Sequence, residues 1–304
     1  MFRYLLRRII QMVPVLFIIT IIVFFFVNAS GDPTSMLLPP NATLEDRDAM
    51  REALGLNKPL YVQYGIFITN AVRGDFGRSF RYKVPALTIV KEKIPASIEL
   101  AGASLLLSIA VGITMGVLSA MAKDTPFDLI ANGFSALGRA MPNFWLGIML
   151  ILLFGVTWRI LPVSGRGGWR HIILPCIALS IQNASRIIPL VRSSMLEIMH
   201  QDYIRTAKSK GIRNSVVIFK HAFKNALVPV VTITALQIPT LIGGSLVTET
   251  VFAWPGLGQL IIQSVNGHDM SVVQACVIII ALITMSANLI ADIVYCLIDP
   301  RIRY

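Results

Sequence analysis

The amino-acid sequence predicts an all-α integral membrane protein, because it has too few polar residues to cover a surface in water. Of the 304 residues, 55% are hydrophobic and 14% are charged, and the mean hydropathy is +0.70. Soluble domains carry about 25% charged residues. Apolar runs of about 20 residues, each long enough to cross a hydrocarbon core of roughly 30 Å as a helix, recur along the chain.

Six such runs are present, and we expect six transmembrane helices, at residues 9–29, 98–121, 130–157, 172–191, 227–248 and 273–297. The first run follows a basic N-terminus and could be taken for a signal peptide. It is about 21 residues long, which exceeds the apolar core of a signal peptide, so we expect it to remain as the first helix.

The third and fourth runs are interrupted by charged residues and prolines, Arg139 and Pro142 in one and Arg186 and Pro189 in the other. In a bilayer such interruptions are tolerated where neighbouring helices or water satisfy the freed polar groups. We therefore expect these two helices inside the bundle and the uniformly apolar first helix against lipid.

The placement of Lys and Arg predicts that both termini are cytoplasmic, since basic residues near span ends are retained on that side. Basic residues precede the first run, gather between the fourth and fifth runs and follow the sixth, whereas residues 249–269 contain none. Segment 30–94 is then extracytoplasmic, as a long loop that crosses largely regardless of charge. The formal net charge of +11 therefore reports topology and does not indicate a nucleic-acid partner.

The extracytoplasmic segment 30–94 has helix start and stop signals of its own. Thr43 and Asp46 predict a short helix that ends at Gly55, and Pro59 opens a second helix that ends near Gly74. Aromatic residues gather on or near one face of the second helix. That helix either lies along the membrane interface or is a passive linker.

The stretch from 197 to 229, between the fourth and fifth runs, predicts a helix, a tight turn and a second helix in the cytoplasm. Gly211 stands where the turn needs a left-handed residue, and Asn225 and Pro229 lead into the next membrane helix. On charge alone this stretch could be a basic loop that contacts anionic lipid headgroups.

The pattern within 197–229 is more specific than basic charge, and residues Ala207, Gly211, Leu227 and Pro229 carry it. It resembles the loop by which membrane subunits of binding-protein-dependent ABC importers dock into their ATPase subunits. The resemblance is to the dipeptide, oligopeptide and nickel branch. It extends over nearly the whole chain through Gly31-Asp32-Pro33, Leu54-Gly55-Leu56, Gly74-Asp75-Phe76-Gly77, Met141-Pro142-Asn143-Phe144-Trp145, Arg192-Ser193-Ser194-Met195, Trp254-Pro255-Gly256-Leu257-Gly258 and Asp299-Pro300-Arg301.

Two positions depart from this branch, Ser30 and Ser271, where proline is common. Both lie outside the predicted helices, so they affect local turns and inferences about the solute and leave the transporter assignment intact.

The resemblance implies the type I ABC importer permease fold, with 1–304 as a single transmembrane permease domain and 197–229 as its cytoplasmic coupling loop. It implies a multi-pass subunit of a bacterial or archaeal cytoplasmic membrane. The expected partners are a second permease subunit that is a different chain, two ATPase subunits that bind ATP and Mg, an extracytoplasmic solute-binding protein and membrane lipid. Peptide, a glutathione-like peptide and nickel or a metal chelate stay open as the solute.

The residues that the resemblance and the loop charge assign to coupling are Tyr203, Arg205, Ala207, Lys208, Lys210, Gly211, His221, Asn225, Leu227 and Pro229. The polar or aromatic residues expected in the translocation path or gate are Arg139, Gln237, Thr248, Glu249 and Trp254. Trp254 could equally be a membrane anchor. For the charged residues Glu99, Arg139 and Asp292, structural pairing is favoured over a functional role. No catalytic or metal-binding residue is expected.

Several other functions lack their motif in this sequence. The chain has no Gly-x-x-x-x-Gly-Lys-Ser/Thr turn to hold phosphates, so we expect that it is not an ATPase and that the ATPase is a separate chain. It also lacks the His-Glu-x-x-His pattern of a metalloprotease. The rival interpretation is a secondary transporter without an ATPase partner, a class that tends to show inverted repeats.

Overall fold

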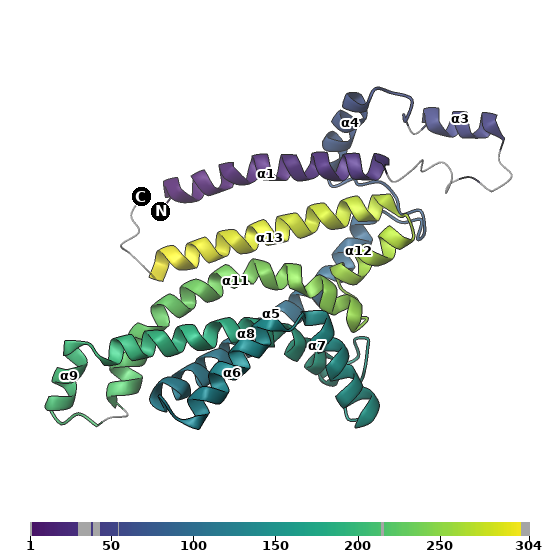
Figure 1. Cartoon of the computed structure of the whole chain (residues 1–304). Helices are drawn as coiled ribbons and strands as arrows, with labels where there is room; N and C mark the ends of the chain where they lie inside the picture. The colour runs from purple at the N-terminus through teal and green to yellow at the C-terminus, as the bar shows by residue number, and fades with distance from the viewer. Residues whose placement is uncertain (1, 30–37, 39–42, 54, 214–215, 299–304) are drawn as a thin grey trace. The chain divides into compact units, whose positions relative to one another are not determined.

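The computed structural model of the chain describes residues 2–29, 38, 43–53, 55–213 and 216–298, and these are almost entirely helical (Figure 1). The all-α fold class is therefore confirmed. Ser30, Leu54 and the Gly31-Asp32-Pro33 and Asp299-Pro300-Arg301 motifs lie outside the described residues. The elements are α1 (Phe2–Ala29), α3 (Leu44–Ala53), α4 (Leu60–Val72), α5 (Ala86–Met121), α6 (Pro126–Ala140), α7 (Asn143–Leu150), the π-helical η1 (Ile151–Thr157), α8 (Trp169–Met199), α9 (Asp202–Ser209), the π-helical η2 (Val217–Ala222), α11 (Phe223–Val251), α12 (Leu257–Asn266) and α13 (Met270–Ile298).

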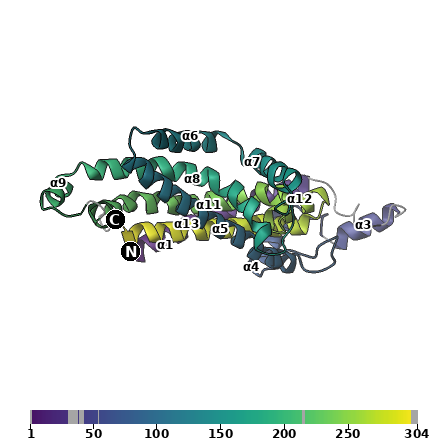
Figure 2. The ribbon, with the colours of Figure 1, turned by 90° about the horizontal axis from the view of Figure 1, so that it is seen from below.

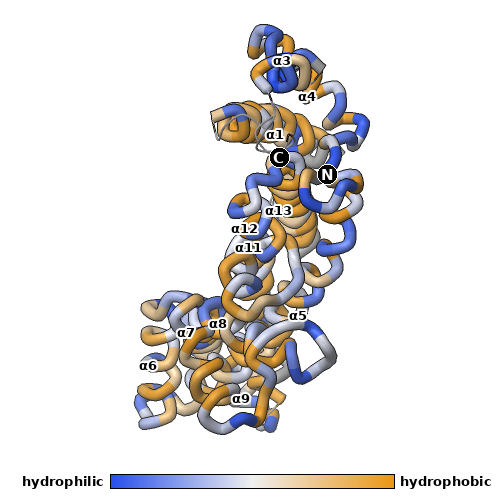
Figure 3. The backbone as a smooth tube through the Cα atoms, turned by 90° about the vertical axis from the view of Figure 1, so that its right-hand side faces the viewer, coloured by the Kyte–Doolittle hydropathy of each residue, from blue (hydrophilic) through white to orange (hydrophobic). Residues whose placement is uncertain are grey.

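Four helices are long and apolar enough to cross a membrane, namely α1, α5, α8 and α13. They contain the predicted runs 9–29, 98–121, 172–191 and 273–297, and α11 contains the whole of the predicted run 227–248. Figure 3 shows α1 and α13 as predominantly hydrophobic tubes, in keeping with mean hydropathies of 2.8 and 2.3 over their candidate spans.

The predicted third span over 130–157 is broken at its predicted interruption. The chain forms two helices there, α6 and the pair α7–η1, which are bent by 108° relative to each other. The bend follows from Pro142, which has no N–H to continue a helix and disfavours a helical conformation at the residue before it. Met141 and Pro142 accordingly have extended ψ angles of 127° and 138°. If this pair counts as one span, the described residues provide up to five candidate spans.

The chain divides into two compact units, which we describe separately. The first comprises Met1–Leu5, Ser97–Trp254 and Ser286–Tyr304, and the second comprises Leu6–Ala96 and Pro255–Met285. In the first unit α8 lies against α6, α7 and α11, and α6 runs alongside α8 (Figure 2). Because 61% of the candidate span of α8 is buried, the expectation that the fourth helix lies inside a bundle is confirmed.

The close packing of α5 on α8 depends on two glycines spaced four residues apart in α5. A Cβ added to Gly112 would lie 2.6 Å from the Ile187 side chain, and one added to Gly116 would lie 2.6 Å from the Val191 side chain. Small residues at this spacing allow the backbones of two membrane helices to approach each other closely.

Gly116→Ala is expected to lower the stability of the folded chain by about 1–3 kcal/mol, because the added Cβ overfills this contact. It would also lie 2.8 Å from the backbone oxygen of Ile188, which cannot rotate away. The matched control is Gly102→Ala in the same helix, where no heavy atom lies within 4 Å and alanine favours the helix by up to about 1 kcal/mol. Thermal unfolding in detergent measures both variants, and equal midpoints would contradict the prediction.

The second unit contains the predicted helices of segment 30–94. Thr43 and Asp46 form the reciprocal bonds of a cap at the start of α3, and Gly55 has a φ of +69° after its end. The Thr43 hydroxyl and N–H lower the pKa of Asp46 from its ordinary value, so this cap is lost as the pH falls through the lowered pKa. Pro59 precedes α4, as predicted.

One face of α4 packs against α1 within the second unit. The hydroxyls of Tyr64 and Thr20 are 2.9 Å apart, and the Phe24 ring lies 5.4 Å from the Tyr64 ring and 5.9 Å from the Phe67 ring between centroids. Tyr61, in contrast, is 78% exposed. The helix therefore has a fixed neighbour, and its place at the membrane interface stays a prediction.

Asp269, just before α13, holds the turn that follows the Gly74-Asp75-Phe76-Gly77 motif. Its buried carboxylate accepts hydrogen bonds from the Ser79 hydroxyl and from the N–H groups of Phe80 and Arg81. The Ser79 oxygen in turn accepts the N–H of Tyr82 at 2.9 Å. This motif therefore has a structural role in the second unit.

Candidate coupling site

The first half of the coupling loop, residues 197–229, is a compact helix that ends in a glycine turn. The helix α9 is closed by hydrogen bonds from Lys210 N–H to Thr206 O and from Ile212 N–H to Ala207 O, at 3.1 and 3.3 Å. Between them Gly211 has a φ of +74°, as the sequence predicted. An added Cβ at Gly211 would meet no heavy atom within 4 Å of this chain. The glycine is therefore required by backbone conformation and not by crowding.

The second half of the coupling loop differs from the prediction in where the next membrane helix begins. The π-helical η2 continues without a break into α11, which starts at Phe223 and not at 227. Asn225 and Leu227 therefore lie in the first turns of α11. The side chains of Lys208, His221 and Pro229 lie outside the described set.

One face of α9 is packed into the chain's own core. Ile204 and Ala207 are 1% and 8% exposed, and they belong to a cluster with Val191 and Met195 of α8 and Val217 of η2. Leu227 packs against the same cluster. A hydrogen bond of 2.9 Å from Asn225 Nδ2 to the Tyr203 hydroxyl ties α11 to α9. The loop is therefore a preformed unit.

The opposite face of α9 is polar and exposed. Arg205 and Asp202 are paired at 3.8 Å with side chains 79% and 98% exposed, a geometry that contributes little to stability. Lys210 is exposed and Tyr203 is 40% exposed. Of the predicted coupling residues, these exposed side chains are available to a partner, whereas Ala207 and Leu227 shape the loop from inside.

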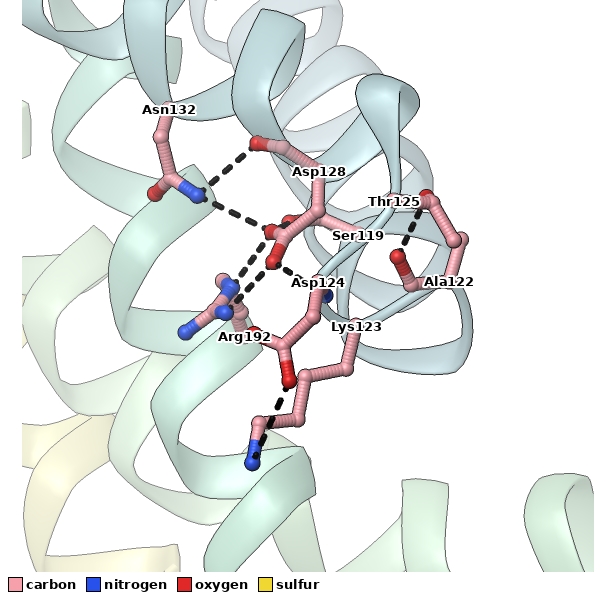
Figure 4. A network of polar contacts seen from close by, with 8 residues as sticks. All are labelled: Ser119, Ala122, Lys123, Asp124, Thr125, Asp128, Asn132 and Arg192. Atoms are coloured by element: carbon pink, nitrogen blue, oxygen red, sulfur yellow. Dashed lines mark hydrogen bonds and ion pairs between the residues drawn. The ribbon is translucent and has the colours of Figure 1, made fainter.

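A buried ion pair behind the coupling loop was missed by sequence reasoning (Figure 4). Arg192 of α8 donates from Nε and Nη2 to the two carboxylate oxygens of Asp128 in α6, both at 2.6 Å. The carboxylate also accepts from the Ser119 hydroxyl at 2.5 Å, Asn132 Nδ2 at 2.9 Å and the Asp124 N–H at 3.1 Å. We call these five residues the Asp128 network.

The Asp128 network joins four pieces of the first unit: the end of α5, the turn after it, the start of α6 and the last third of α8. The Asp128 and Arg192 side chains are 6% and 23% exposed. Arg192 lies seven residues, about two helical turns, before the end of α8 that leads to α9. Met195, between them, belongs to the cluster that holds α9. The helix α8 therefore carries both Arg192 of the Asp128 network and Met195 of the cluster that holds α9.

The sequence did contain a signal for Asp128. Thr125 and Pro126 are a helix start, and an acidic residue two positions after the proline is favoured in the first helical turn. The predicted third span begins at 130, just beyond this residue, and Arg192 stands in the motif Arg192-Ser193-Ser194-Met195 with no pairing partner predicted for it.

The residues predicted for the translocation path differ in how far they are buried. Gln237, Thr248, Glu249 and Trp254 are at most 4% exposed, whereas Arg139 is exposed and donates from Nε to the Ser135 carbonyl at 3.1 Å. Their role in a path or gate stays a prediction. The burial of Trp254 does not fit the alternative of a membrane anchor, since an anchoring indole lies among headgroups.

Gln237 is the path candidate with the clearest polar requirement. Both polar atoms of its side chain are buried, and neither has a hydrogen-bond partner in the described part of the chain. A buried amide without partners is costly unless water enters the site. Gln237 in α11 is therefore a place where water is expected inside the bundle.

Glu99 confirms the preference for structural pairing, although at a more exposed place than expected. Its carboxylate accepts hydrogen bonds from Arg166 Nε at 2.9 Å and Nη2 at 2.5 Å, and both side chains are more than 40% exposed. The Arg166 guanidinium carbon also lies 5.8 Å from the centre of the Trp254 ring. Asp292 is partly buried.

Comparison with known proteins gives matches over nearly the whole chain. Residues 112–304 match the family described as binding-protein-dependent transport system inner membrane component, and residues 1–101 match the N-terminal family of the same membrane components. The oligopeptide transport system permease protein AppB of Bacillus subtilis is 39% identical over 316 residues, and the glutathione transport system permease protein GsiC of Escherichia coli K12 is 36% identical over 305 residues. Both alignments cover 100% of each chain.

A solved structure supports the fold. An inward-facing conformation of the MetNI methionine ABC transporter aligns with a TM-score of 0.59 and 18% identity, over 69% of this chain and 96% of that chain. At this identity the match bears on the fold alone.

Proposed function

Since the chain belongs to the family of binding-protein-dependent transport system inner membrane components, we propose that it forms part of the pore of an ATP-driven peptide importer. The single observation that carries this proposal is the coupling loop, whose α9 is packed on one face and exposed on the other. The permeases quoted above are named for oligopeptide and glutathione. Short peptides are therefore the proposed solute, and the nickel alternative has no support in those names.

The proposed partners follow from the family and from the sequence. The chain is a multi-pass, non-enzymatic membrane component, and its sequence contains no phosphate-holding turn. We propose that two ATPase subunits on separate chains bind ATP and Mg and dock against the exposed face of α9. A second, different permease chain completes the pore, and an extracytoplasmic protein delivers the solute.

Uptake by the reconstituted importer tests this function against the secondary-transporter alternative. Proteoliposomes would contain both permeases and the ATPases, with ATP inside and the binding protein with a labelled tripeptide outside. We expect uptake that requires ATP and the binding protein and is unaffected by a proton ionophore. Uptake that continues without ATP and is abolished by the ionophore would establish a secondary transporter instead.

We also propose that the chain lies in the cytoplasmic membrane with both termini in the cytoplasm. The support is the placement of the basic residues, which gather in the coupling loop and are absent from 249–269. Segment 30–94 is then extracytoplasmic and α9 is cytoplasmic.

Cysteine labelling with a membrane-impermeant maleimide is expected to separate these two sides. Gly65→Cys in α4 should react in intact cells, and Lys210→Cys should react only after the membrane is permeabilised. Both positions are exposed, and an added Cβ at Gly65 meets no heavy atom within 4 Å, so neither change disturbs packing. The native Cys176 and Cys276 are buried, and the third native cysteine, Cys296, is replaced by serine in both variants to keep the background low. Labelling of residue 210 in intact cells would reverse the topology.

A further inference from the structure

The segment between η1 and α8 carries more positive charge than its position leads one to expect. Residues 158–171 contain Arg159, Arg166 and Arg170 and no carboxylate. They precede the start of α8, whereas the far end of this 31-residue helix leads into α9. With α9 in the cytoplasm, the segment lies at the outer face, where Lys and Arg are normally scarce. This charge therefore needs a compensating group.

The three arginines differ in how far the chain itself compensates them. Arg166 donates two hydrogen bonds to Glu99. Arg170 donates from Nη2 to the Ile160 carbonyl at 2.5 Å, which uses one of the five N–H groups of a guanidinium. Within the described residues, Arg159 makes no hydrogen bond or ion pair. Arg159 and Arg170 are therefore available to an anion.

These two arginines face a hollow of about 440 Å³ that is also lined by Trp169, His171 and the first turn of α8. The N–H groups of a first helical turn favour an anion, although that of His171 already donates to the Gly168 carbonyl at 3.1 Å. The His171 Nδ1 is buried and has no hydrogen-bond partner in the described part of the chain. The two arginines and the start of α8 thus offer the donors of the hollow, whose lining contains no carboxylate.

Glycines keep this hollow open. Gly168 has a φ of +135°, a conformation that residues with a Cβ rarely adopt, and it is the residue before the first turn of α8. A Cβ on Gly167 would lie 3.0 Å from Cε1 of the His171 ring. The two glycines therefore allow a backbone conformation, and leave a space beside the His171 ring, that residues with a Cβ would not.

The surroundings of the hollow are apolar and exposed. Trp158 and Trp169 are 55% and 75% exposed, and Ile160 and Val163 are 48% and 39% exposed. Tryptophan at the end of a membrane helix lies at the level of the headgroups. A ligand for this place therefore has an anionic head and apolar chains. We propose that the hollow binds an anionic phospholipid of the outer leaflet, with its phosphate on Arg159 and Arg170 and its acyl chains along the two indoles.

Native mass spectrometry of the purified importer complex, with phosphatidylglycerol or phosphatidylcholine added, tests the proposal. Wild type is expected to retain phosphatidylglycerol in preference to phosphatidylcholine. The double variant Arg159→Gln/Arg170→Gln should bind phosphatidylglycerol at least about tenfold more weakly, because charge-assisted hydrogen bonds are lost. Arg73→Gln removes an exposed arginine from segment 30–94 and should bind like wild type.

Three results would overturn the proposal. The first is equal retention of phosphatidylglycerol by wild type and the double variant, and the second is equal retention of the two lipids by wild type. The third is a double variant that retains phosphatidylglycerol in the mass-spectrometric assay but weakens docking of the solute-binding protein in bilayers without this lipid, which would make a protein carboxylate the ligand. Arg159→Lys/Arg170→Lys keeps the charge and should keep most of the lipid, which separates loss of binding from loss of folding. The outcome does not affect the uptake test, since the inference uses only the proposed topology.

Discussion

Gly211→Val is expected to insert and fold as wild type does, yet to lose at least about nine-tenths of ATP-driven uptake. The φ of Gly211 is +74°, and a residue with a Cβ is less stable by about 1–2 kcal/mol in that conformation. A penalty of about 1.4 kcal/mol reduces the population of molecules in which the turn at residue 211 has its left-handed conformation by about tenfold. Nothing within 4 Å of the added Cβ crowds it in this chain, so the loss arises from the turn.

Two further substitutions at Gly211 separate the turn from the contact with the ATPase. Asparagine tolerates the left-handed conformation, so Gly211→Asn should retain most uptake. Gly211→Asp has a similar shape but adds a negative charge beside Arg205 and Lys210. If an acidic surface of the ATPase meets this face, the aspartate variant should release the ATPase or hydrolyse ATP without transport, whereas the asparagine variant should not.

The control for backbone strain alone is Gly55→Val, since Gly55 also has a positive φ, +69°, and only ordinary contacts of 3.7 Å or more around its Cβ. It lies in segment 30–94, which we propose to be extracytoplasmic, and should leave ATPase binding unchanged. Co-purification of the ATPase and uptake into proteoliposomes are the two measurements. A Gly211→Val protein that transports at the normal rate with its ATPase bound would show that the coupling loop is only a charged connector.

The features that could be predicted from the sequence are those that depend on neighbouring residues. The cap formed by Thr43 and Asp46, the helix that begins after Pro59 and the turn at Gly211 each follow from local backbone and hydrogen-bonding rules. The long helices follow from their apolar runs. The bend at Pro142 was also readable, but the apolar run on both sides of it favoured a single span.

The features that could not be predicted depend on which surfaces meet. Ala207 is predicted as a coupling residue, and its packing in the chain's own core, at 8% exposure, does not follow from its place in the motif. Asp128 and Arg192 are 64 residues apart, and neither residue type nor local spacing indicates that they pair. Only the packing of α6 on α8 brings them together. The sequence pattern therefore predicts the coupling loop but not the Asp128 network.

Asp128→Ala is expected to destabilise the folded permease by about 3 kcal/mol and to uncouple ATP hydrolysis from uptake. Removing one partner of a buried ion pair typically costs about 3–5 kcal/mol, and the 23% exposure of Arg192 favours the lower end. The change also leaves the Ser119 hydroxyl without its acceptor and removes one of the two acceptors of Asn132 Nδ2, which keeps the carbonyl of residue 128 at 2.8 Å. Arg192→Ala should cost less, since the carboxylate keeps three of its donors.

Charge reversal distinguishes the Asp128 network from a simple ion pair. In Asp128→Arg/Arg192→Asp the two charges are exchanged, but the N–H of Asp124 can only donate, and Ser119 and Asn132 must turn their oxygens toward the new side chain at position 128. A guanidinium has no acceptor for the Asp124 N–H, so the double variant should recover only part of the stability. Arg192→Lys should be less stable than wild type but more stable than Arg192→Ala, because an ammonium keeps the charge but cannot make the bidentate contact.

The control in the same region is Lys123→Ala. Lys123 and Asp124 form an exposed pair at 3.9 Å, which should contribute less than about 1 kcal/mol.

Thermal unfolding in detergent measures stability, and the ratio of ATP hydrolysed to peptide imported measures coupling. If the network only stabilised the fold, that ratio would stay constant among the molecules that remain folded. Because α8 connects Arg192 directly to α9, we expect the ratio to rise in Asp128→Ala and to remain normal in Lys123→Ala. Full recovery by the charge-reversed double variant would show that the pair acts through charge alone and that the surrounding donors have no role.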